Sequence, residues 1–463
     1  MFSRRFKIFL AIIFFTALAS GYFWPHQFYF QSLRGGGDEV LYDHIATDLI
    51  EKGTFTTQGR PVYIEPLYPF FLAGVYTVFG HHLDAVRFIQ LGIFALTAVL
   101  IAILGWRLFS ERVGIAAGAF SAVYWGFANM TGVLLRETLS IFLMVVLAHA
   151  LISATVTRKT RYFLMAGAVL GFYILLNAII QYFILPALIL YFCVLRGLPF
   201  KQIVLRMAVF VCAVIFVLAP WMVRNHIYYQ HDGAFIVPRT GQMIALRASL
   251  METLWPNMPK YFFGHAFGYY FAEKIYPDFD TRAFRDFSLF NSRVKQLQNQ
   301  GYDYAEIDAK LLDVSIQYIK EHPQQYAAMF LLDIISFTSP IIPQRIFGGN
   351  SFMHFTFAEG RFSQVPTWIK TTMLITVRFI WYMLLGLVLF AFVQFRNRMK
   401  DVWWLLSLCM VVTIAYCSVH GIPRYALPLH PFYFILAIAS AFSIWDTIGH
   451  RCTKTVRMTP KLT

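Results

Sequence analysis

The chain has 463 residues and a formal net charge of +15, yet only 14% of its residues are charged, whereas 58% are hydrophobic and 18% are aromatic. This composition excludes an ordinary soluble domain and predicts an all-α, polytopic membrane protein. The positive charge does not indicate a nucleic-acid partner, because a large share of the cations lies in short loops between apolar segments, where membrane topology and anionic lipids explain them.

Ten apolar segments are expected to cross the membrane, because a bilayer core about 30 Å thick requires roughly 20 apolar residues in each helix. In chain order they are 6–24, 85–108, 113–130, 133–155, 163–178, 181–195, 203–223, 369–395, 402–418 and 425–448. Arg4 and Arg5 before the first segment resemble the start of a secretory signal. The apolar run continues to Trp24, however, which favours a retained helix.

Clusters of Lys and Arg predict the orientation of the chain, because short loops rich in these residues stay on the cytoplasmic side. The clusters follow the fourth, sixth and eighth segments and lie near both ends: Arg158, Lys159, Arg161; Arg196, Lys201, Arg206; Arg396, Arg398, Lys400; Arg4, Arg5, Lys7; Arg451, Lys454, Arg457, Lys461. We therefore expect an inner or plasma membrane protein with both termini in the cytoplasm and its active site on the periplasmic or extracellular side.

The predicted spans and loops divide the chain into three parts. They are an N-terminal transmembrane module at 1–223 with an acidic first outer loop at 25–84, an extracytoplasmic lobe at 224–367, and C-terminal transmembrane helices with a cytoplasmic tail at 368–463. The apolar stretch 326–343 in the lobe contains Asp333 and Pro340, and counting it as a span would make the total odd. It therefore predicts an interfacial helix on the outer leaflet.

The first outer loop concentrates carboxylates beside the membrane: Asp38, Glu39, Asp43, Asp48 and Glu51. Helical spacing from Asp38 onward puts four apolar residues on one face, which predicts an amphipathic helix along the membrane surface. These four are Leu41, Ile45, Leu49 and Ile50. Three glycines before Asp38 allow a sharp turn into the helix. Asp38 then begins the helix, and a structural role as its N-cap is the alternative to a catalytic role.

Seven motifs, spread in order over nearly the whole chain, carry a resemblance to a known group of enzymes. They are GDEVLYDHIATDL from Gly37, PLYPFFLAGVYTVFG from Pro66, AVRFIQ from Ala85, RETL from Arg136, APWMVRN from Ala219, EHPQQY from Glu321 and HGIPRYALPLHP from His420. The ordered set resembles membrane glycosyltransferases of the GT-C superfamily. It is similar in particular to the protein O-mannosyltransferase and aminoarabinose transferase group, which uses polyprenyl-phosphate sugars.

Two departures from that group's pattern stand out. The usual PPLYP occurs here as EPLYP, so that Glu65 adds a carboxylate near the expected site. The fifth apolar segment reads LLNAII, from Leu175 to Ile180, where many relatives carry an LTRP-like element. Because that arginine is missing, the contacts to donor or acceptor are expected to differ from those of the better-known relatives.

The resemblance implies an inverting glycosyltransferase that moves a sugar from a polyprenyl-phosphate carrier to a lipid, glycan or protein acceptor. By resemblance Asp38 is the base that takes the proton of the acceptor hydroxyl, and Glu39 orients the acceptor or holds the loop. An arginine fork suits the lipid phosphate because it bonds two oxygens at once. The candidates are Arg136, Arg224, Arg345 and Arg424. Residues expected to support the acceptor or the loop are Asp43, Glu65, Tyr68, Glu137 and His420.

No cofactor is assigned, and a metal site is not expected. His81, His82 and Asp84 lie close together in sequence, but their spacing matches no recognised metal site. Two alternatives to a transferase stay open. One is a lipid-linked glycan flippase or transporter, although such proteins place charges along a path near the bilayer midplane and this chain keeps most of its charges at segment ends. The other is a non-catalytic assembly partner.

Overall fold

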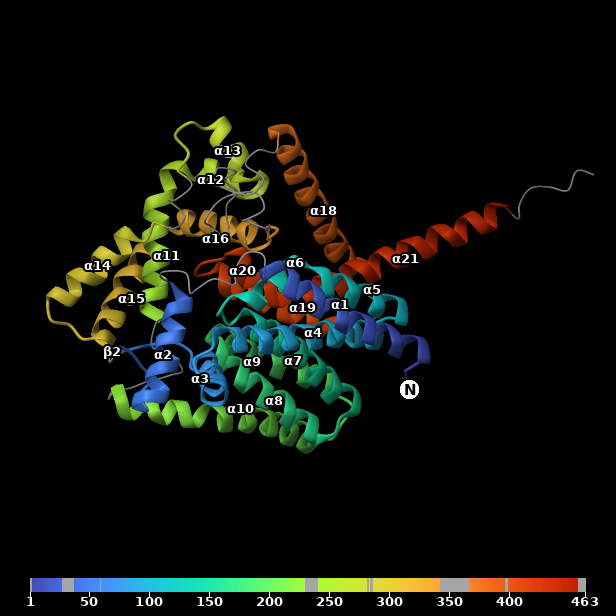
Figure 1. The fold of residues 1–463 in the computed structure, drawn as a ribbon, viewed down its shortest axis with the longest axis horizontal. Coiled ribbons are helices and arrows are strands. Elements are labelled where there is room, and N and C mark those ends of the chain that lie inside the picture. The colour runs from blue at the N-terminus through green and yellow to red at the C-terminus, as the bar shows by residue number, and fades with distance from the viewer. Residues whose placement is uncertain are drawn as a thin grey trace, which may run out of the picture.

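The computed structural model describes residues 2–26, 37–58, 60–229, 240–280, 283, 286–341, 366–395 and 399–456 (Figure 1). Over these residues the fold is helical except for one antiparallel hairpin of two short strands, β1 (Thr56–Thr57) and β2 (Arg60–Pro61). The expected all-helical membrane fold is therefore confirmed.

Within the described residues, seven helical segments are long and apolar enough to cross a membrane. They are Arg4–Phe23 of α1 (Arg4–His26), α4 (Leu83–Leu108), α7 (Glu137–Thr157), η2 with α9 (Ala178–Phe183 and Ile184–Leu195), Phe200–Ile227 of α10 (Phe200–Tyr229), Thr371–Gln394 of α18 (Thr367–Gln394), and Pro423–Ile448, which takes in α20 (Pro423–Ala426), η6 (Leu427–Leu429) and most of α21 (His430–Val456).

The three other predicted segments are also helical, but each departs from a single long span. The segment at 113–130 is a bent pair, in which α5 (Glu111–Val123) is followed at an angle of 50° by α6 (Trp125–Ala128) with η1 (Asn129–Gly132). The segments at 163–178 and 402–418 form the shorter apolar helices α8 (Thr160–Leu176) and α19 (Met399–Cys417). By length and composition, the described residues thus contain seven candidate spans, or eight if the bent pair counts as one.

Small residues let the helices of the bundle approach closely. A Cβ atom at Gly114 of α5 would lie 2.8 Å from the backbone nitrogen of Trp106 on α4. A Cβ atom at Gly171 of α8 would lie 2.8 Å from the Cβ atom of Val217 on α10. Close backbone packing of this kind stabilises helix pairs in lipid, where the hydrophobic effect does not drive helices together.

The first outer loop folds into the predicted helix α2 (Asp38–Lys52), the β1–β2 hairpin and a second helix, α3 (Leu67–Phe79). Figure 1 shows α2 at the left end of the bundle, below the lobe. Ile45 is buried as expected, but Ile50 is 46% exposed, and the carboxylates of Asp43 and Asp48 are buried instead. The predicted apolar face is wrong in these positions because α2 packs against the rest of its own loop.

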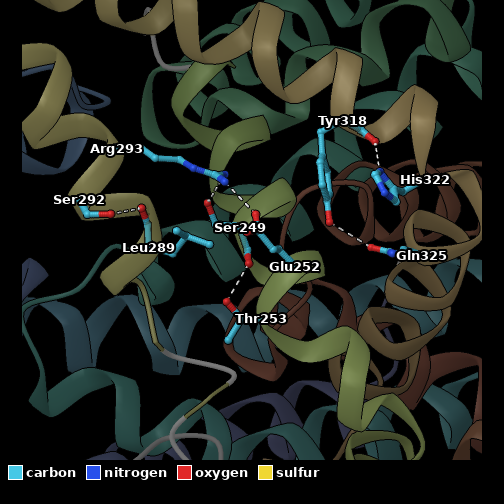
Figure 2. Close-up of polar contacts among 9 residues, drawn as sticks. All are labelled: Ser249, Glu252, Thr253, Leu289, Ser292, Arg293, Tyr318, His322 and Gln325. Atoms are coloured by element: carbon cyan, nitrogen blue, oxygen red, sulfur yellow. Dashed lines mark hydrogen bonds and ion pairs between the residues drawn. The ribbon is translucent and has the colours of Figure 1, made fainter.

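The lobe is built from helices at the same end of the molecule (Figure 1). They are α11 (Thr240–Leu254), η3 (Trp255–Asn257), α12 (Met258–Phe267), α13 (Tyr269–Ile275), α14 (Ser288–Asn299), α15 (Tyr304–Glu321) and α16 (Pro323–Phe337). Figure 2 shows Arg293 of α14 reaching across to α11, where it donates to Ser249 at 3.3 Å and pairs with Glu252 at 2.7 Å. This ion pair lies on the surface of the lobe.

Helix α16 occupies much of the stretch predicted as an interfacial helix, and it is not one of the candidate spans found in the described residues. Its side chain Asp333 is completely buried and forms an ion pair with Arg247 of α11, which is also completely buried. Arg247 also donates to the carbonyl oxygen of Cys417, at the end of α19, at 3.2 Å. Helix α16 thus contacts α11 and α12 of the lobe and α19 of the bundle.

Candidate active site

Asp38 is the first residue of α2, because the chain enters the helix through Gly37. The φ angle of Gly37 is 90°, a conformation that favours glycine. Gly37, rather than Asp38, is the N-cap residue, and the N-cap makes no side-chain hydrogen bond. The alternative of Asp38 as an N-cap is therefore wrong. The Asp38 side chain is 51% exposed, and its Oδ2 atom accepts a hydrogen bond from Nη2 of Arg424 at 3.0 Å.

Arg424 connects Asp38 to a second carboxylate. Its Nε atom lies 3.1 Å from Oε1 of Glu137, the first residue of α7, and its guanidinium group lies over the ring of Tyr425. Glu137 is only 6% exposed, and its Oε2 atom makes no hydrogen bond to any described residue. The structure thus brings together three residues that the sequence predicts separately, from α2, α7 and α20.

A second ion pair joins Glu65 and Arg136. Nη1 of Arg136 lies 3.0 Å from Oε2 of Glu65 and donates to the carbonyl oxygen of Leu176 at 3.2 Å. Oε1 of Glu65 accepts the backbone N–H of Ala178 at 3.1 Å. Burial is the largest single effect on the pKa of Arg136 and lowers it, but the electrostatic effects of several neighbours, Glu65 first, together bring the pKa well above its usual value.

The two sequence departures meet in this second pair. Glu65 replaces the usual proline of the first loop, and Leu176 and Ala178 belong to the LLNAII stretch that replaces the LTRP-like element. The helix α8 ends at Leu176, and Asn177 separates it from η2 in an extended conformation. Glu65 and Arg136 therefore bond to backbone groups that this break leaves without a helical partner.

Tyr42 lies close enough to both ion pairs for their charges to act on its phenol. It is 8% exposed, and its ring meets that of Tyr68 edge to face with 5.0 Å between the centroids. Burial raises the pKa of the Tyr42 phenol, Arg136 opposes the rise, and the negative charge of Asp38 adds to it. The charges of Glu65 and Glu137 act in the same direction as Asp38. Tyr42 therefore stays protonated and is a neutral hydrogen-bond donor at this place.

Sequence reasoning missed Tyr42, although a signal was present. Residues four positions apart lie on the same side of a helix, and Tyr42 follows Asp38 by four residues. Asn177 and Tyr416 were missed as well. The amide of Asn177 donates to the hydroxyl oxygen of Tyr416 at 2.5 Å, and the ring of Tyr416 stacks on Tyr425, next to Arg424. These contacts depend on residues that are far apart in sequence.

Several predicted residues have other contacts. Asp43 accepts a hydrogen bond from the hydroxyl of Tyr76 at 2.6 Å and lies 2.8 Å from Nε2 of His81. Tyr68 donates to Gln90 at 3.1 Å. These bonds join α2, α3 and α4. The loop-supporting role of Asp43 and Tyr68 stays a prediction.

The remaining candidates are placed as follows. Arg224 lies over the ring of Trp221 and donates to the side chain of Asn225. The ring of His420 meets the edge of Phe287 in the lobe. Glu39 is half-buried in the first turn of α2. Arg345 lies outside the described residues.

A metal site is not part of this geometry. Where the structure describes the chain, no three side chains of His, Cys, Asp or Glu gather in a way that could hold an ion. His81 pairs with Asp43, whereas the carboxylates of Asp38 and Glu137 pair with Arg424. The expectation of a metal-free site stays a prediction.

Comparison with known families supports the resemblance drawn from the motifs. Residues 60–223 match the family described as dolichyl-phosphate-mannose-protein mannosyltransferase. This segment contains Glu65, Arg136 and Glu137, whereas Asp38 and Arg424 lie outside it. Among proteins of curated function, none matches the sequence.

Solved structures give the fold. The oligosaccharyltransferase AglB from Archaeoglobus fulgidus, in complex with an inhibitory peptide and a dolichol-phosphate, is 13% identical with a TM-score of 0.54. That similarity covers 100% of this chain and 53% of AglB, so the chain spans about half the length of that enzyme. The apo form of the same archaeal enzyme is 14% identical over 99% of this chain and 53% of its own, with a TM-score of 0.53.

ArnT from Cupriavidus metallidurans bound to undecaprenyl phosphate is 14% identical over 94% of this chain and 76% of its own, and its TM-score is 0.37. The fold comparison therefore rests on the archaeal enzyme. The chain therefore has the fold of the archaeal oligosaccharyltransferase, and its residues 60–223 are similar to the family described as dolichyl-phosphate-mannose-protein mannosyltransferase.

Proposed function

We propose that the protein is an integral-membrane glycosyltransferase that moves a sugar from a polyprenyl-phosphate carrier to a lipid, glycan or protein acceptor, with inversion. The observation that carries this proposal is the half-exposed carboxylate of Asp38, held at a helix start by an arginine that also pairs with the buried Glu137. The donor class is supported by the description of the matching family and by the dolichol-phosphate bound to the archaeal enzyme of the same fold.

In the proposed reaction, Asp38 takes the proton of the acceptor hydroxyl while the hydroxyl oxygen attacks the anomeric carbon. The bond between that carbon and the phosphate oxygen breaks, and the lipid phosphate leaves with the electron pair. Arg424 holds the carboxylate of Asp38 in place through the 3.0 Å hydrogen bond. The exposed fraction of Asp38 supports this role, because a base has to reach its substrate.

The leaving group needs a cation, because the donor is a phosphodiester with one negative charge and the product is a monoester that gains another. Inversion puts the base and the leaving group on opposite faces of the sugar. Arg424 is bonded to the base, so we assign the phosphate contact to Arg136. Its pair with Glu65 and its bond to the Leu176 carbonyl fix the guanidinium group before substrate binds.

An extracytoplasmic site is supported by the course of α7. This helix begins at Glu137, in the site, and ends at Thr157, immediately before the cationic residues Arg158 and Lys159. Its 21 residues span about 31 Å, which matches the thickness of a bilayer core. Because cationic loops stay in the cytoplasm, the site end of α7 belongs to the opposite side.

The test compares purified wild type, Asp38→Asn and Glu51→Gln in nanodiscs. Each is given radiolabelled polyprenyl-phosphate sugars together with an extract of membrane lipids and glycans, and release of the lipid phosphate is followed. Asp38→Asn is expected to lower turnover by roughly 100- to 10,000-fold, because a positioned general base contributes that much. Glu51→Gln removes an exposed carboxylate near the other end of the same helix and is expected to leave turnover unchanged.

Turnover that is unchanged in Asp38→Asn would refute the assigned base while leaving a transferase. Absence of turnover by the wild type with every donor would instead favour the lipid-linked glycan flippase or the assembly partner. Inversion is tested separately from the anomeric configuration of the product, which nuclear magnetic resonance determines directly.

A further inference from the structure

The fully buried ion pair of the lobe, Arg247 with Asp333, lies next to the segment that leads to Arg424. Arg247 pairs with Asp333 and donates to the carbonyl oxygen of Cys417 at 3.2 Å. Arg247 also lies over the ring of Tyr326, whose hydroxyl donates to the carbonyl oxygen of Ser418 at 3.1 Å. Two neighbouring carbonyl groups at the end of α19 are thus held by side chains of the lobe.

The same pair reaches the next residues of the turn. The backbone of Gly421 lies close enough to the carboxylate of Asp333 to lower the pKa of that group, against the larger rise caused by burial. A Cβ atom at Gly421 would lie 2.8 Å from the carbonyl oxygen of Asp333 and 2.9 Å from its Cβ atom, so the two backbones are in direct contact. The turn 417–421 is therefore fixed at both its beginning and its end by Arg247 and Asp333.

Arg424 follows this turn by three residues, which span at most about 11 Å of extended chain. Helix α20 begins at Pro423, whose ring restricts the backbone further. A displacement of the turn would therefore move the guanidinium group of Arg424 relative to Asp38 and Glu137. We propose that Arg247 and Asp333 are positioning residues, which hold the turn 417–421 so that Arg424 meets Asp38.

The proposal rests on the proposed function of Asp38 as the base, and burial of the pair gives it further support. Neither side chain is exposed, and Nε of Arg247 and Oδ1 of Asp333 make no hydrogen bond within the described part of the chain. Replacing a buried ion pair by apolar residues of similar volume is often neutral or stabilising. Stabilisation of the fold alone therefore poorly explains why these two buried positions carry charged residues.

The first experiment uses the double variant Arg247→Met/Asp333→Leu, which removes both charges and keeps an apolar interior. We expect a folded protein in which kcat falls by roughly 10- to 100-fold, because small misplacements of reacting groups cost that much, while KM for the donor changes little. The matched control is Glu252→Gln/Arg293→Met, which removes the exposed ion pair of the same lobe (Figure 2). It should leave kcat unchanged.

A second readout does not require activity. In a background without native cysteines, Asp38→Cys and Arg424→Cys are joined with a short bis-maleimide, and the cross-linked fraction is measured on a gel. We expect efficient cross-linking in this background, a large loss on adding Arg247→Met/Asp333→Leu, and no loss on adding the control pair. Unchanged cross-linking in the double variant would overturn the positioning role, whether or not the protein is a transferase.

Gly421→Ala keeps the experiment decisive if the double variant does not fold. It leaves Arg247 and Asp333 intact but forces the turn away from the Asp333 backbone, so it should lower both kcat and cross-linking. Normal kcat and cross-linking in Gly421→Ala would contradict the proposal. If the wild type shows no turnover with any donor, the proposed function fails, and the cross-linking result still decides whether the turn is held by the lobe.

Discussion

Two arginine–carboxylate pairs, one in the candidate active site and one inside the lobe, differ chiefly in their access to solvent. Asp38 is 51% exposed and Arg424 is 17% exposed, whereas Arg247 and Asp333 are both 0% exposed. Burial raises the pKa of Asp333 against the attraction of Arg247. A substrate can reach a carboxylate that is half exposed while its arginine still holds it, whereas no substrate can reach the fully buried pair.

This difference in exposure predicts a small loss of stability when the exposed pair is broken and a large loss when the buried pair is broken. Breaking an exposed pair costs little stability, because water solvates the group left behind. Breaking a buried pair leaves a charge without solvent or counter-ion. Under the proposed function, the two costs therefore distinguish a residue that acts in the reaction from residues that hold the fold.

The largest expected effect is the loss of catalysis when the pair of Asp38 and Arg424 is broken. Asp38→Asn should lower turnover by roughly 100- to 10,000-fold while changing the free energy of unfolding by less than about 1 kcal/mol. Denaturant titration in mixed micelles, run beside the turnover assay, measures both quantities on one sample. A fall in stability comparable to the loss of transition-state stabilisation would show that Asp38 holds the fold rather than the substrate.

The next largest effect is expected when one residue of the buried pair, Arg247 with Asp333, is removed. Arg247→Ala leaves the carboxyl group of Asp333 buried without its partner and should lower the free energy of unfolding by about 3 to 5 kcal/mol. Arg293→Ala, which breaks the exposed pair with Glu252 in the same lobe, should lower it by less than about 1 kcal/mol. Equal losses in the two variants would erase the distinction between the pairs.

A smaller effect is expected at the second pair of the site, which lies between these extremes. Glu65 and Arg136 are 16% and 17% exposed. Glu65→Gln keeps an acceptor for the Ala178 N–H but removes the charge that Arg136 faces, and should cost about 1.5 to 3 kcal/mol of unfolding free energy. Glu51→Gln is again the control. If Glu65→Gln lowers the free energy of unfolding no more than the control does, Glu65 contributes no more to stability than a solvent-exposed carboxylate.

The smallest effect concerns His265, which lies in the lobe and is 5% exposed. Burial, followed by the charges of Arg378 and His420, lowers its pKa to about 3. Below pH 6.5 the unfolded state therefore binds a proton that the native state does not, and the free energy of unfolding should fall by about 1.4 kcal/mol for each pH unit.

The check is the difference between wild type and His265→Gln, followed by thermal unfolding at pH 7.5 and pH 5.0. Wild type should lose more stability than the variant between these values. Parallel curves would mean that the pKa of His265 is the same in the native and the unfolded state.

Hydropathy was sufficient to predict the helices of the bundle, because the thickness of the membrane sets the length of an apolar run. It was not sufficient to predict which of them are broken. The bend of 50° after Val123 and the break at Asn177, where Glu65 accepts the N–H of Ala178, lie inside segments that hydropathy treats as continuous. Periodicity also misplaced Asp43, because a helix that packs on several sides buries polar residues wherever a partner such as Tyr76 is present.

The candidate site was partly predictable. The motifs named Asp38, Glu137 and Arg424 as separate candidates, and the structure shows which carboxylate each arginine contacts. The pair of Arg247 and Asp333 carried no local signal. Asp333 is an isolated acid in an apolar stretch, and its partner lies 86 positions earlier in the chain. Such pairing depends on the tertiary fold alone.

The bond between Asp38 and Arg424 also sets an order of events during synthesis. The two residues are 386 positions apart, and translation at roughly 5 to 20 residues per second separates their appearance by roughly 20 to 80 s. Until the last helices have entered the membrane, a nascent chain exposes the carboxylate without its arginine. A ribosome that stalls before this point would release a truncated chain that lacks the arginine needed to complete the site.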